Sequence, residues 1–337
     1  MSAMSGLLGR PGDRWPLPAA VDDLASSARW AGIPGLIWFA GIWYPSLNVN
    51  VEFLQAVFGL LERTTGAELP EFLAPAEPTM FVPLMPTLVL SPGNLAEMAG
   101  MTLLLLLPVL ILYRLHVGLA FVSAPGVPLR DEQGRRTRTL SGAWRAGRKL
   151  GLTAFGMWVT LMALMMGALA FLVGPLVILV GLLHLREIEP FLFGLIVPTV
   201  VMLLGYGVIL QVVNQLALHS LANNRRGVVS ALTHAWRLIR NDPWGAVRAA
   251  LIDIFLFVLV ALVAVTAGRT LAIVFAETGL AWLLTVVVSY ALLGFVGTTR
   301  AAFWARAYRA LGGLSPADRV PGLGGPFEPA PKPAAEE

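Results

Sequence analysis

The chain of 337 residues contains no cysteine and only four histidines. The absence of cysteine excludes disulfides, thiolate metal sites and a cysteine nucleophile. The sequence also has no Walker loop, no H-E-x-x-H or G-x-S-x-G motif and no paired carboxylates at a hydrolase spacing. The histidines show no paired spacing of the kind that metal ligands have; they are His116, His184, His219 and His234. We therefore expect no metal and no cofactor, and we predict that the protein is not an enzyme.

Charge is scarce as well, because 13% of the residues are charged whereas 57% are hydrophobic. A water-soluble globule needs more charge at its surface, so the composition predicts an all-α integral membrane protein. About 20 apolar residues are needed to cross roughly 30 Å of hydrocarbon as a helix. About six runs approach or exceed this length, of which the first is the shortest: 31–46, 98–122, 152–182, 190–217, 245–268 and 280–305.

The basic residues predict the orientation of these spans. When the connections are placed on alternating sides, only Arg63, Arg186 and Arg269 fall on one side, and the rest of the 24 lysines and arginines fall on the other. By the positive-inside rule the basic side is cytoplasmic. We therefore expect a multi-pass protein of the bacterial inner membrane with both termini in the cytoplasm. The positive net charge then reports topology, and no nucleic-acid partner is expected.

The stretch "RRGVVSALTHAWRLIRNDPW", residues 225–244, interleaves apolar and basic residues between two apolar runs. Its spacing predicts an amphipathic helix, because two sets of side chains separate onto opposite faces. Such a helix lies in the headgroup layer, with its arginines toward anionic lipid and its Trp at the boundary. Asp242 and Pro243 then begin the next span. The apolar set is Val228, Leu232, Ala235, Trp236 and Ile239; the polar set is Arg226, Ser230, Thr233, Arg237 and Arg240.

Similar segments precede the third span and the first. Residues 139–150 are expected to place Leu140, Ala143, Trp144 and Gly147 on one face and Arg145, Arg148 and Lys149 elsewhere. Residues 17–30 are expected to place Val21, Leu24, Ala25 and Ala28 opposite Asp22, Asp23, Ser26 and Ser27. The pattern predicts three tandem repeats, each an interfacial elbow helix followed by a transmembrane hairpin. The repeats cover residues 17–123, 139–219 and 226–311.

A resemblance to a known family rests on two stretches: the elbow "ALTHAWRLIRNDPW" and the end of the last span, "TTRAAFWARAYRAL". Residues 139–311 resemble uncharacterised bacterial polytopic membrane proteins related to the membrane domain of glycerophosphoryl diester phosphodiesterases. The shared motif is short, A-W-R-x-x-R-x-x-P-W. The resemblance implies a common membrane scaffold. It does not imply the phosphodiesterase activity, because the acidic metal-binding cluster of the catalytic domain is missing.

Three segments lie outside the repeats or interrupt them. Residues 1–16 are expected to form an N-terminal cytoplasmic tail, and residues 312–337, rich in Pro, Gly and Ala, a disordered cytoplasmic extension. The outer connection 47–94 is long, and its prolines exclude regular structure over much of its length. Its Pro-rich part, 64–94, has two possible roles: a cap over the bundle or a surface that docks a partner. The sequence does not decide between them.

The candidate intramembrane polar site centres on Asp253, about ten residues into the fifth span. A lone ionised Asp there is costly, so it must be protonated, paired or in contact with water. Arg114 and Arg300 are the expected counter-charges. Gln211, Asn214 and Gln215 occupy one face of the fourth span. These amides either bond neighbouring helices or line a wet cavity, and Asp253 belongs either to a structural ion pair or to a proton or substrate site.

The first interpretation of the whole chain is a non-enzymatic membrane scaffold, or a subunit of a larger membrane assembly. Its elbows bind anionic phospholipids through Trp144, Arg145, Arg148, Lys149, Trp236, Arg237 and Arg240, and a membrane-protein partner is a further expectation. The alternative is a permease or lipid-handling transporter with a cavity around Asp253 and the amides of the fourth span. A third, less favoured alternative is an intramembrane lipid-modifying enzyme.

Overall fold

The structure is a computed structural model whose regular elements are helices throughout the residues that it describes, apart from an isolated β-bridge between Arg130 and Arg136. This confirms the all-helical class. The outer connection 47–94, most of both tails and parts of the first two predicted spans lie outside the described residues. The described ranges are 15–32, 37–42, 110–131, 133–183, 189–274 and 280–314.

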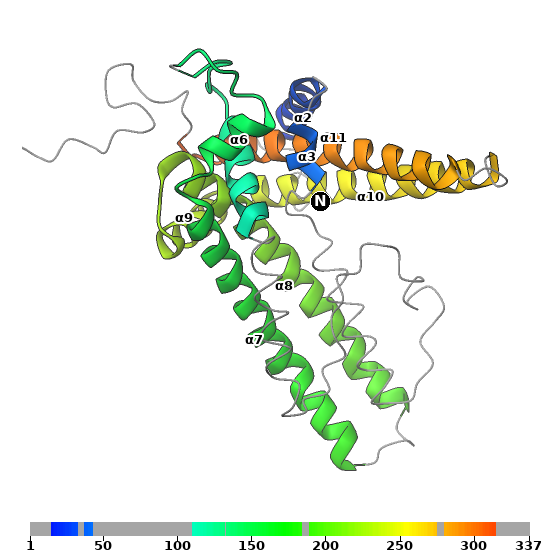
Figure 1. The fold of residues 1–337 in the computed structure, drawn as a ribbon. Helices are drawn as coiled ribbons and strands as arrows, with labels where there is room; N and C mark the ends of the chain where they lie inside the picture. The colour runs from blue at the N-terminus through cyan, green and yellow to red at the C-terminus, as the bar shows by residue number, and fades with distance from the viewer. Residues whose placement is uncertain are drawn as a thin grey trace, which may run out of the picture. The chain divides into compact units, whose positions relative to one another are not determined.

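The chain divides into two compact units. The core unit comprises the described parts of residues 1–45, 109–157 and 212–337, and the apolar unit those of 46–108 and 158–211. Helices α7 (Gly151–Leu183) and α8 (Glu189–Asn224) each begin in one unit and end in the other (Figure 1). The helices are α2 (Leu17–Ala31), α3 (Ile37–Ile42), Leu110–Val122, α6 (Leu140–Ala146), α7 (Gly151–Leu183), α8 (Glu189–Asn224), α9 (Val228–Asn241), α10 (Pro243–Val274) and α11 (Leu280–Ala310).

The last turns of α11 form the centre of the core unit. Helices α2, α3 and α10 pack against α11, and Figure 1 shows α10 in yellow running beside α11 in orange. From Thr298 to Ala305 every side chain is buried, including the large rings of Phe303 and Trp304. A helix that is buried on all sides needs neighbours all round, so this stretch organises the unit.

Glycines allow α3 and α11 to cross at very short range. A Cβ placed on Gly297 would overlap the carbonyl oxygen of Gly41, and one placed on Gly41 would overlap that of Gly294. Small residues let helix backbones approach closely, which replaces side-chain packing with backbone contact. The four-residue spacing of Gly297, Ala301 and Ala305 predicts a small-residue face on α11, and all three residues are buried.

Helix α6 is shorter than the predicted elbow and packs closely against Leu110–Val122. A Cβ on Gly118 would overlap the carbonyl oxygen of Ala143, and a Cβ on Gly147 would overlap that of Arg114. The helix is capped by Thr139, whose hydroxyl accepts a hydrogen bond of 3.0 Å from the backbone N–H of Gly142. These contacts fix α6 directly ahead of α7.

Helix α2 packs against the protein through a face other than the apolar face of the predicted elbow. Val21 is 50% exposed and Ala25 is exposed too, whereas Ala20, Ser27 and Ala31 are buried. The reason is a polar partner on α11, which attracts the serine and aspartate face of α2, as described below. Hydrophobic periodicity predicted a helix here, and lipid contact of its apolar face stays a prediction.

Helix α9 packs against the protein through a narrow face that shares Ala235 with its predicted apolar stripe. Its buried residues are Ala231, Ala235 and Leu238, whereas Trp236 is 48% exposed. The large apolar side chains therefore lie beside the packed alanine face and remain available to surroundings other than the protein. The junction that follows is as predicted: α10 begins at Pro243, and the backbone N–H of Gly245 donates a hydrogen bond of 2.7 Å to Asp242 Oδ1.

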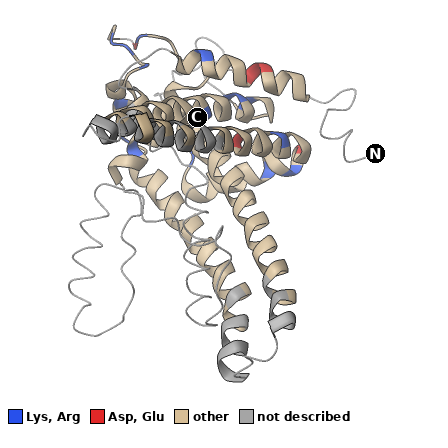
Figure 2. Ribbon diagram, turned by 90° about the vertical axis from the view of Figure 1, so that its right-hand side faces the viewer, with Lys and Arg blue, Asp and Glu red and all other residues tan. Residues whose placement is uncertain are grey.

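The apolar unit has a different character. Residues 158–183 and 190–211 include no charged residue, and Figure 2 accordingly shows neither blue nor red on this described length of α7 and α8. Large apolar side chains are exposed here, among them Phe171 at 78% and Met202 at 59%. Two helical stretches, Gly151–Leu172 and Val197–Asn224, are long and apolar enough to cross a membrane. The six-span arrangement and the tandem repeats stay predictions.

Candidate functional site

The central feature of the core unit is a buried ion pair between α10 and α11. Arg300 Nε lies 2.5 Å from Asp253 Oδ1, and Arg300 Nη2 lies 2.7 Å from Asp253 Oδ2. The side chains are only 4% and 2% exposed, respectively. Of the two arginines expected as counter-charges for Asp253, Arg300 is the one that the structure places beside it.

The geometry of the pair explains how two charges are tolerated inside the unit. Both carboxylate oxygens of Asp253 accept a hydrogen bond from the planar guanidinium, which is the strongest arrangement of this kind. Removing two charges from water costs several kcal/mol per ion, and only good geometry with further hydrogen bonds offsets that cost. The pair thus fixes α10 against α11 at one register.

Arg114, the other expected counter-charge, lies elsewhere. Its guanidinium carbon is 3.5 Å from the centroid of the Trp144 ring, and its Nε donates a hydrogen bond of 3.1 Å to the backbone carbonyl of Trp144. The prediction that Arg114 pairs with Asp253 is therefore not met. The close glycine contacts between α6 and Leu110–Val122 bring Trp144 within reach and give the cation an aromatic face. The same contact holds Trp144, one of the predicted lipid-facing residues, against the protein.

The amides predicted on the fourth span divide between the two units. Asn214 and Gln215 belong to the core unit, and their side chains are 7% and 0% exposed. Gln211 is half-buried and belongs to the apolar unit. The last turns of α8 continue with further buried polar residues, His219, Ser220 and Asn223. The C-terminal part of α8 thus contributes a polar interior to the core unit.

A cluster around Tyr308 was not predicted from the sequence. Asn224 Nδ2 donates a hydrogen bond of 2.7 Å to the Tyr308 hydroxyl, and the rings of His219 and His234 lie 6.2 and 6.0 Å from the Tyr308 ring. Tyr308 joins α8, α9 and α11. Burial raises the pKa of Tyr308, and burial followed by the charges of Arg226 and Arg237 lowers the pKa of His234. The spacing of the sequence could have indicated Tyr308, because a residue eleven positions after Gly297 lies on the same small-residue face of α11.

A second missed network joins α2 to α11. Arg306 Nη1 donates a hydrogen bond of 3.0 Å to Ser27 Oγ, and Arg306 Nε lies 3.9 Å from Asp23 Oδ1. The indole N–H of Trp15 donates to Asp23 Oδ2 at 2.9 Å, and the Trp15 ring packs 6.0 Å from that of Phe303. This network is why the polar face of α2 packs inward.

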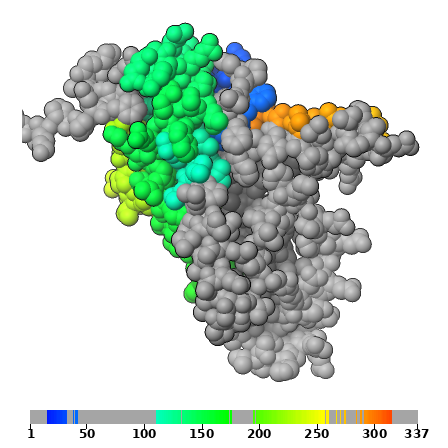
Figure 3. Space-filling model, viewed as in Figure 1, coloured from blue at the N-terminus to red at the C-terminus, as the bar shows by residue number. Residues whose placement is uncertain are grey.

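The basic residues predicted on the second elbow separate into two groups. Arg145 Nη2 lies 3.7 Å from Asp131 Oδ2 and donates a hydrogen bond of 3.2 Å to the backbone carbonyl of Arg136. Both partners belong to the connection between Leu110–Val122 and α6, which is visible at the surface in Figure 3. Arg148 and Lys149 are exposed and have no acidic partner among the described residues. On the third elbow, Arg237 and Arg240 are exposed as well.

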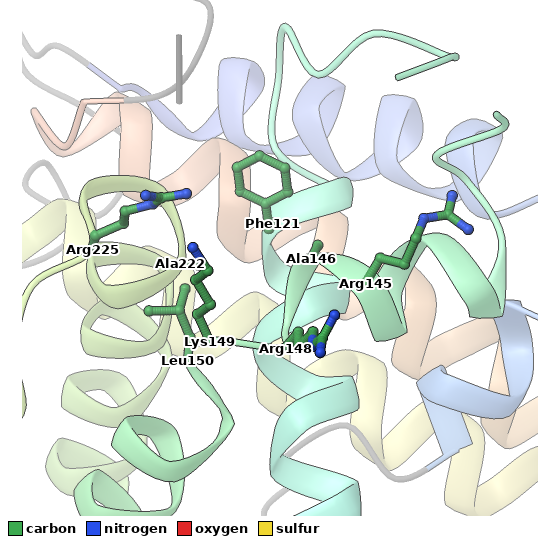
Figure 4. Close-up of a pocket in the computed structure, with 8 residues that line it drawn as sticks. All are labelled: Phe121, Arg145, Ala146, Arg148, Lys149, Leu150, Ala222 and Arg225. Carbon is green, nitrogen blue, oxygen red and sulfur yellow. The ribbon is translucent and has the colours of Figure 1, made fainter. Parts of the chain in front are cut away.

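A cavity of about 160 Å³ opens beside Arg148 and Lys149. Its wall combines basic and apolar side chains from three parts of the core unit (Figure 4). The cavity was not predicted from the sequence, because it adds residues from α8 and from the 110–124 segment to those of the elbow. The lining residues are Phe121, Arg145, Ala146, Arg148, Lys149, Leu150, Ala222 and Arg225.

Nothing among the described residues indicates a metal centre, since no three His, Asp or Glu side chains converge there. Comparison of the chain with protein-family models, with curated proteins and with solved structures finds no match. The resemblance to the membrane domain of glycerophosphoryl diester phosphodiesterases therefore stays a prediction, and the function is argued from the geometry alone.

Proposed function

We propose that the protein is a non-enzymatic, multi-pass scaffold of the bacterial inner membrane, or a subunit of a larger membrane assembly. In this proposal six spans form three tandem repeats, each an elbow followed by a hairpin, and both termini are cytoplasmic. Two features of the described chain support it. Helices α2, α6 and α9 each precede a helix of a predicted hairpin, and the exposed surface of α7 and α8 is apolar, as lipid contact requires.

The Asp253–Arg300 pair is the observation that carries the scaffold proposal. A carboxylate that transfers protons or binds a substrate must exchange with water or ligand, whereas both oxygens of Asp253 are engaged by one buried guanidinium. The pair suits a structural lock between α10 and α11. Basic residues of the elbows, Arg148, Lys149, Arg237 and Arg240 among them, would hold the bundle at an anionic leaflet.

A lipid-handling transporter or permease is the second candidate, and Asn214 favours it. The Oδ1 atom of Asn214 is buried and makes no hydrogen bond with the described residues. A buried acceptor of this kind suits a water molecule or a polar ligand within the bundle. In that case Asp253 and the α8 amides would line a path that opens during a transport cycle.

Substitution of the ion pair distinguishes these candidates. Asp253→Ala leaves Arg300 buried without its carboxylate, and we expect a loss of about 3–5 kcal/mol in the free energy of unfolding. The double variant Asp253→Leu/Arg300→Met replaces the pair by apolar groups and should recover most of that loss. The measurement is thermal or denaturant unfolding of the purified full chain. Asp22→Ala, which removes an exposed aspartate on α2, is the matched control and should change the stability by less than about 0.5 kcal/mol.

Chemical modification gives an independent readout. Dicyclohexylcarbodiimide is apolar and reacts with carboxyl groups that become protonated in apolar surroundings. A structural lock predicts that Asp253 stays unmodified in the folded protein at neutral pH. Rapid modification of Asp253, together with a double apolar variant that stays as unstable as Asp253→Ala, would contradict the scaffold and favour the transporter.

A further inference from the structure

The cavity beside α6 points to a ligand of definite chemistry. We propose that it binds the phosphate group of an anionic phospholipid. The inference rests on the proposed function, because a phospholipid reaches the cavity only if the elbows lie at the membrane surface. It goes further by assigning one discrete site, where the elbows alone predict attraction spread over a surface.

The lining concentrates positive charge. Arg148 and Lys149 come from the turn after α6, Arg225 comes from the connection between α8 and α9, and Arg145 comes from α6 itself. Among the eight described lining residues there is no carboxylate, and the charge of Arg145 is partly met by Asp131. Guanidinium and ammonium groups bind phosphate oxygens through charge-assisted hydrogen bonds, which are stronger than neutral ones.

The size and the remaining wall suit a phosphate ester better than a bare ion. At about 160 Å³ the cavity is far larger than the roughly 10–15 Å³ that one water molecule needs. Phe121, Leu150 and Ala222 supply apolar surface, and Figure 4 shows the Phe121 ring between Arg225 on one side and Arg145 on the other. A phospholipid presents both kinds of group, a charged phosphate and an apolar glycerol and acyl region.

Two backbone features add to the electrostatic case. Helix α7 begins at Gly151, directly after the lining residue Leu150, so the positive end of its dipole is adjacent to the cavity. Arg225 has φ 51°, in the left-handed region that glycine adopts without cost. A side chain in that conformation costs on the order of 1–2 kcal/mol. The chain thus carries a cation at a position where glycine would stabilise the end of α8.

The strained position of Arg225 provides a sharp test. Arg225→Gly removes the cation while relieving the backbone, so the melting temperature should stay unchanged or rise. Binding of phosphatidylglycerol to the delipidated full-length protein, measured by native mass spectrometry, should weaken about tenfold, the effect of losing one charge-assisted hydrogen bond. The variant Arg148→Gln/Lys149→Gln should weaken binding by at least as much. Arg130→Gln/Arg136→Gln, on exposed residues of the connection before α6 and outside the cavity, is the matched control and should bind as the unaltered protein does.

Three ligands distinguish the source of the phosphate. Phosphatidylglycerol should bind more tightly than glycerol 3-phosphate, which lacks the acyl chains, and phosphatidylcholine should bind weakly because its headgroup has no net charge. Tighter binding of glycerol 3-phosphate than of phosphatidylglycerol would overturn the lipid assignment. Equal losses in the cavity variants and in the Arg130→Gln/Arg136→Gln control would overturn the discrete site, as would cavity variants that bind phosphatidylglycerol like the unaltered protein. A chain that inserts into membranes yet retains no anionic lipid contradicts this inference alone, whereas a chain recovered in the soluble fraction contradicts the proposed function too.

Discussion

The core unit and the apolar unit place their polar and apolar residues in opposite ways. The core unit buries Asp253, Arg300, Gln215 and His219, whereas the apolar unit exposes Phe171 and other large apolar side chains. In water, both arrangements are costly, since buried charge needs partners and exposed apolar area needs cover. In a bilayer lipid would cover the exposed apolar surface, and the buried polar groups are tolerated because they bond within the protein. In a bilayer, contacts within the protein would stabilise the core unit, and contact with lipid would stabilise the apolar unit.

Of the substitutions that compare the two units, introducing a charge into the apolar unit should have the largest effect. Met202 is 59% exposed on α8, and a soluble protein would accept Met202→Lys there with little change. If α8 crosses a bilayer, the same substitution should disfavour insertion by up to about 2.5–3.5 kcal/mol, the cost of Lys at the centre of a span. Ser230→Lys, at an exposed position on α9, is the control in the core unit and should insert normally. The fraction of chain that resists carbonate extraction from membranes measures the effect, and equal insertion of both variants would remove the contrast between the units.

Adding one methyl group should have opposite effects in the two units. Gly297→Ala places a Cβ against the Gly41 carbonyl, so α3 and α11 must separate, and we expect a loss of about 1–3 kcal/mol. Gly205→Ala in the apolar unit meets no atom within 4 Å and should gain roughly 0.5–1 kcal/mol, because alanine favours the helix. Melting temperatures of both variants test the pair. If Gly297→Ala melted at or above the unaltered protein, α3 and α11 would not cross as described.

Removing one hydroxyl should give the smallest effect. Tyr308→Phe leaves Asn224 Nδ2 without its acceptor, and we expect a loss of about 0.5–1.5 kcal/mol. Tyr206 lies in the apolar unit, and its hydroxyl makes no hydrogen bond with the described residues, so Tyr206→Phe should be close to neutral. Denaturant midpoints of the two variants provide the comparison. A Tyr206→Phe loss as large as that of Tyr308→Phe would show that tyrosine hydroxyls contribute equally in both units.

The sequence predicted the elements well because apolar runs and caps are local signals. The helical class, the start of α10 at Pro243 and the small face of α11 follow from composition, capping chemistry and four-residue spacing. The packing faces of α2 and α9 did not follow. An amphipathic pattern shows which side chains avoid water, but α2 packs where Arg306 offers Asp23 and Ser27 a partner that lies 279 residues from Ser27 along the chain.

The candidate site was predictable only in part for the same reason. A charge within an apolar run indicates that it has a partner. Few arginines lie near the inner ends of the spans, so the sequence could name Arg300 as one of two candidates. The choice between Arg114 and Arg300 depends on how closely helices pack. Gly118 and Gly147 bring α6 so near to Leu110–Val122 that Arg114 reaches Trp144 instead. The cavity depends on three separate segments, and no local pattern encodes it.

Single-cysteine labelling tests the central claim most directly, because the chain has no cysteine of its own and each variant carries one thiol. Gln133→Cys and Thr233→Cys, both at exposed positions in the core unit, should react with a membrane-impermeant maleimide only after the cells are permeabilised. Glu189→Cys, at the first residue of α8, should react in intact spheroplasts. Labelling of Gln133→Cys and Thr233→Cys from opposite sides of the membrane would contradict the account of elbows that share the cytoplasmic face.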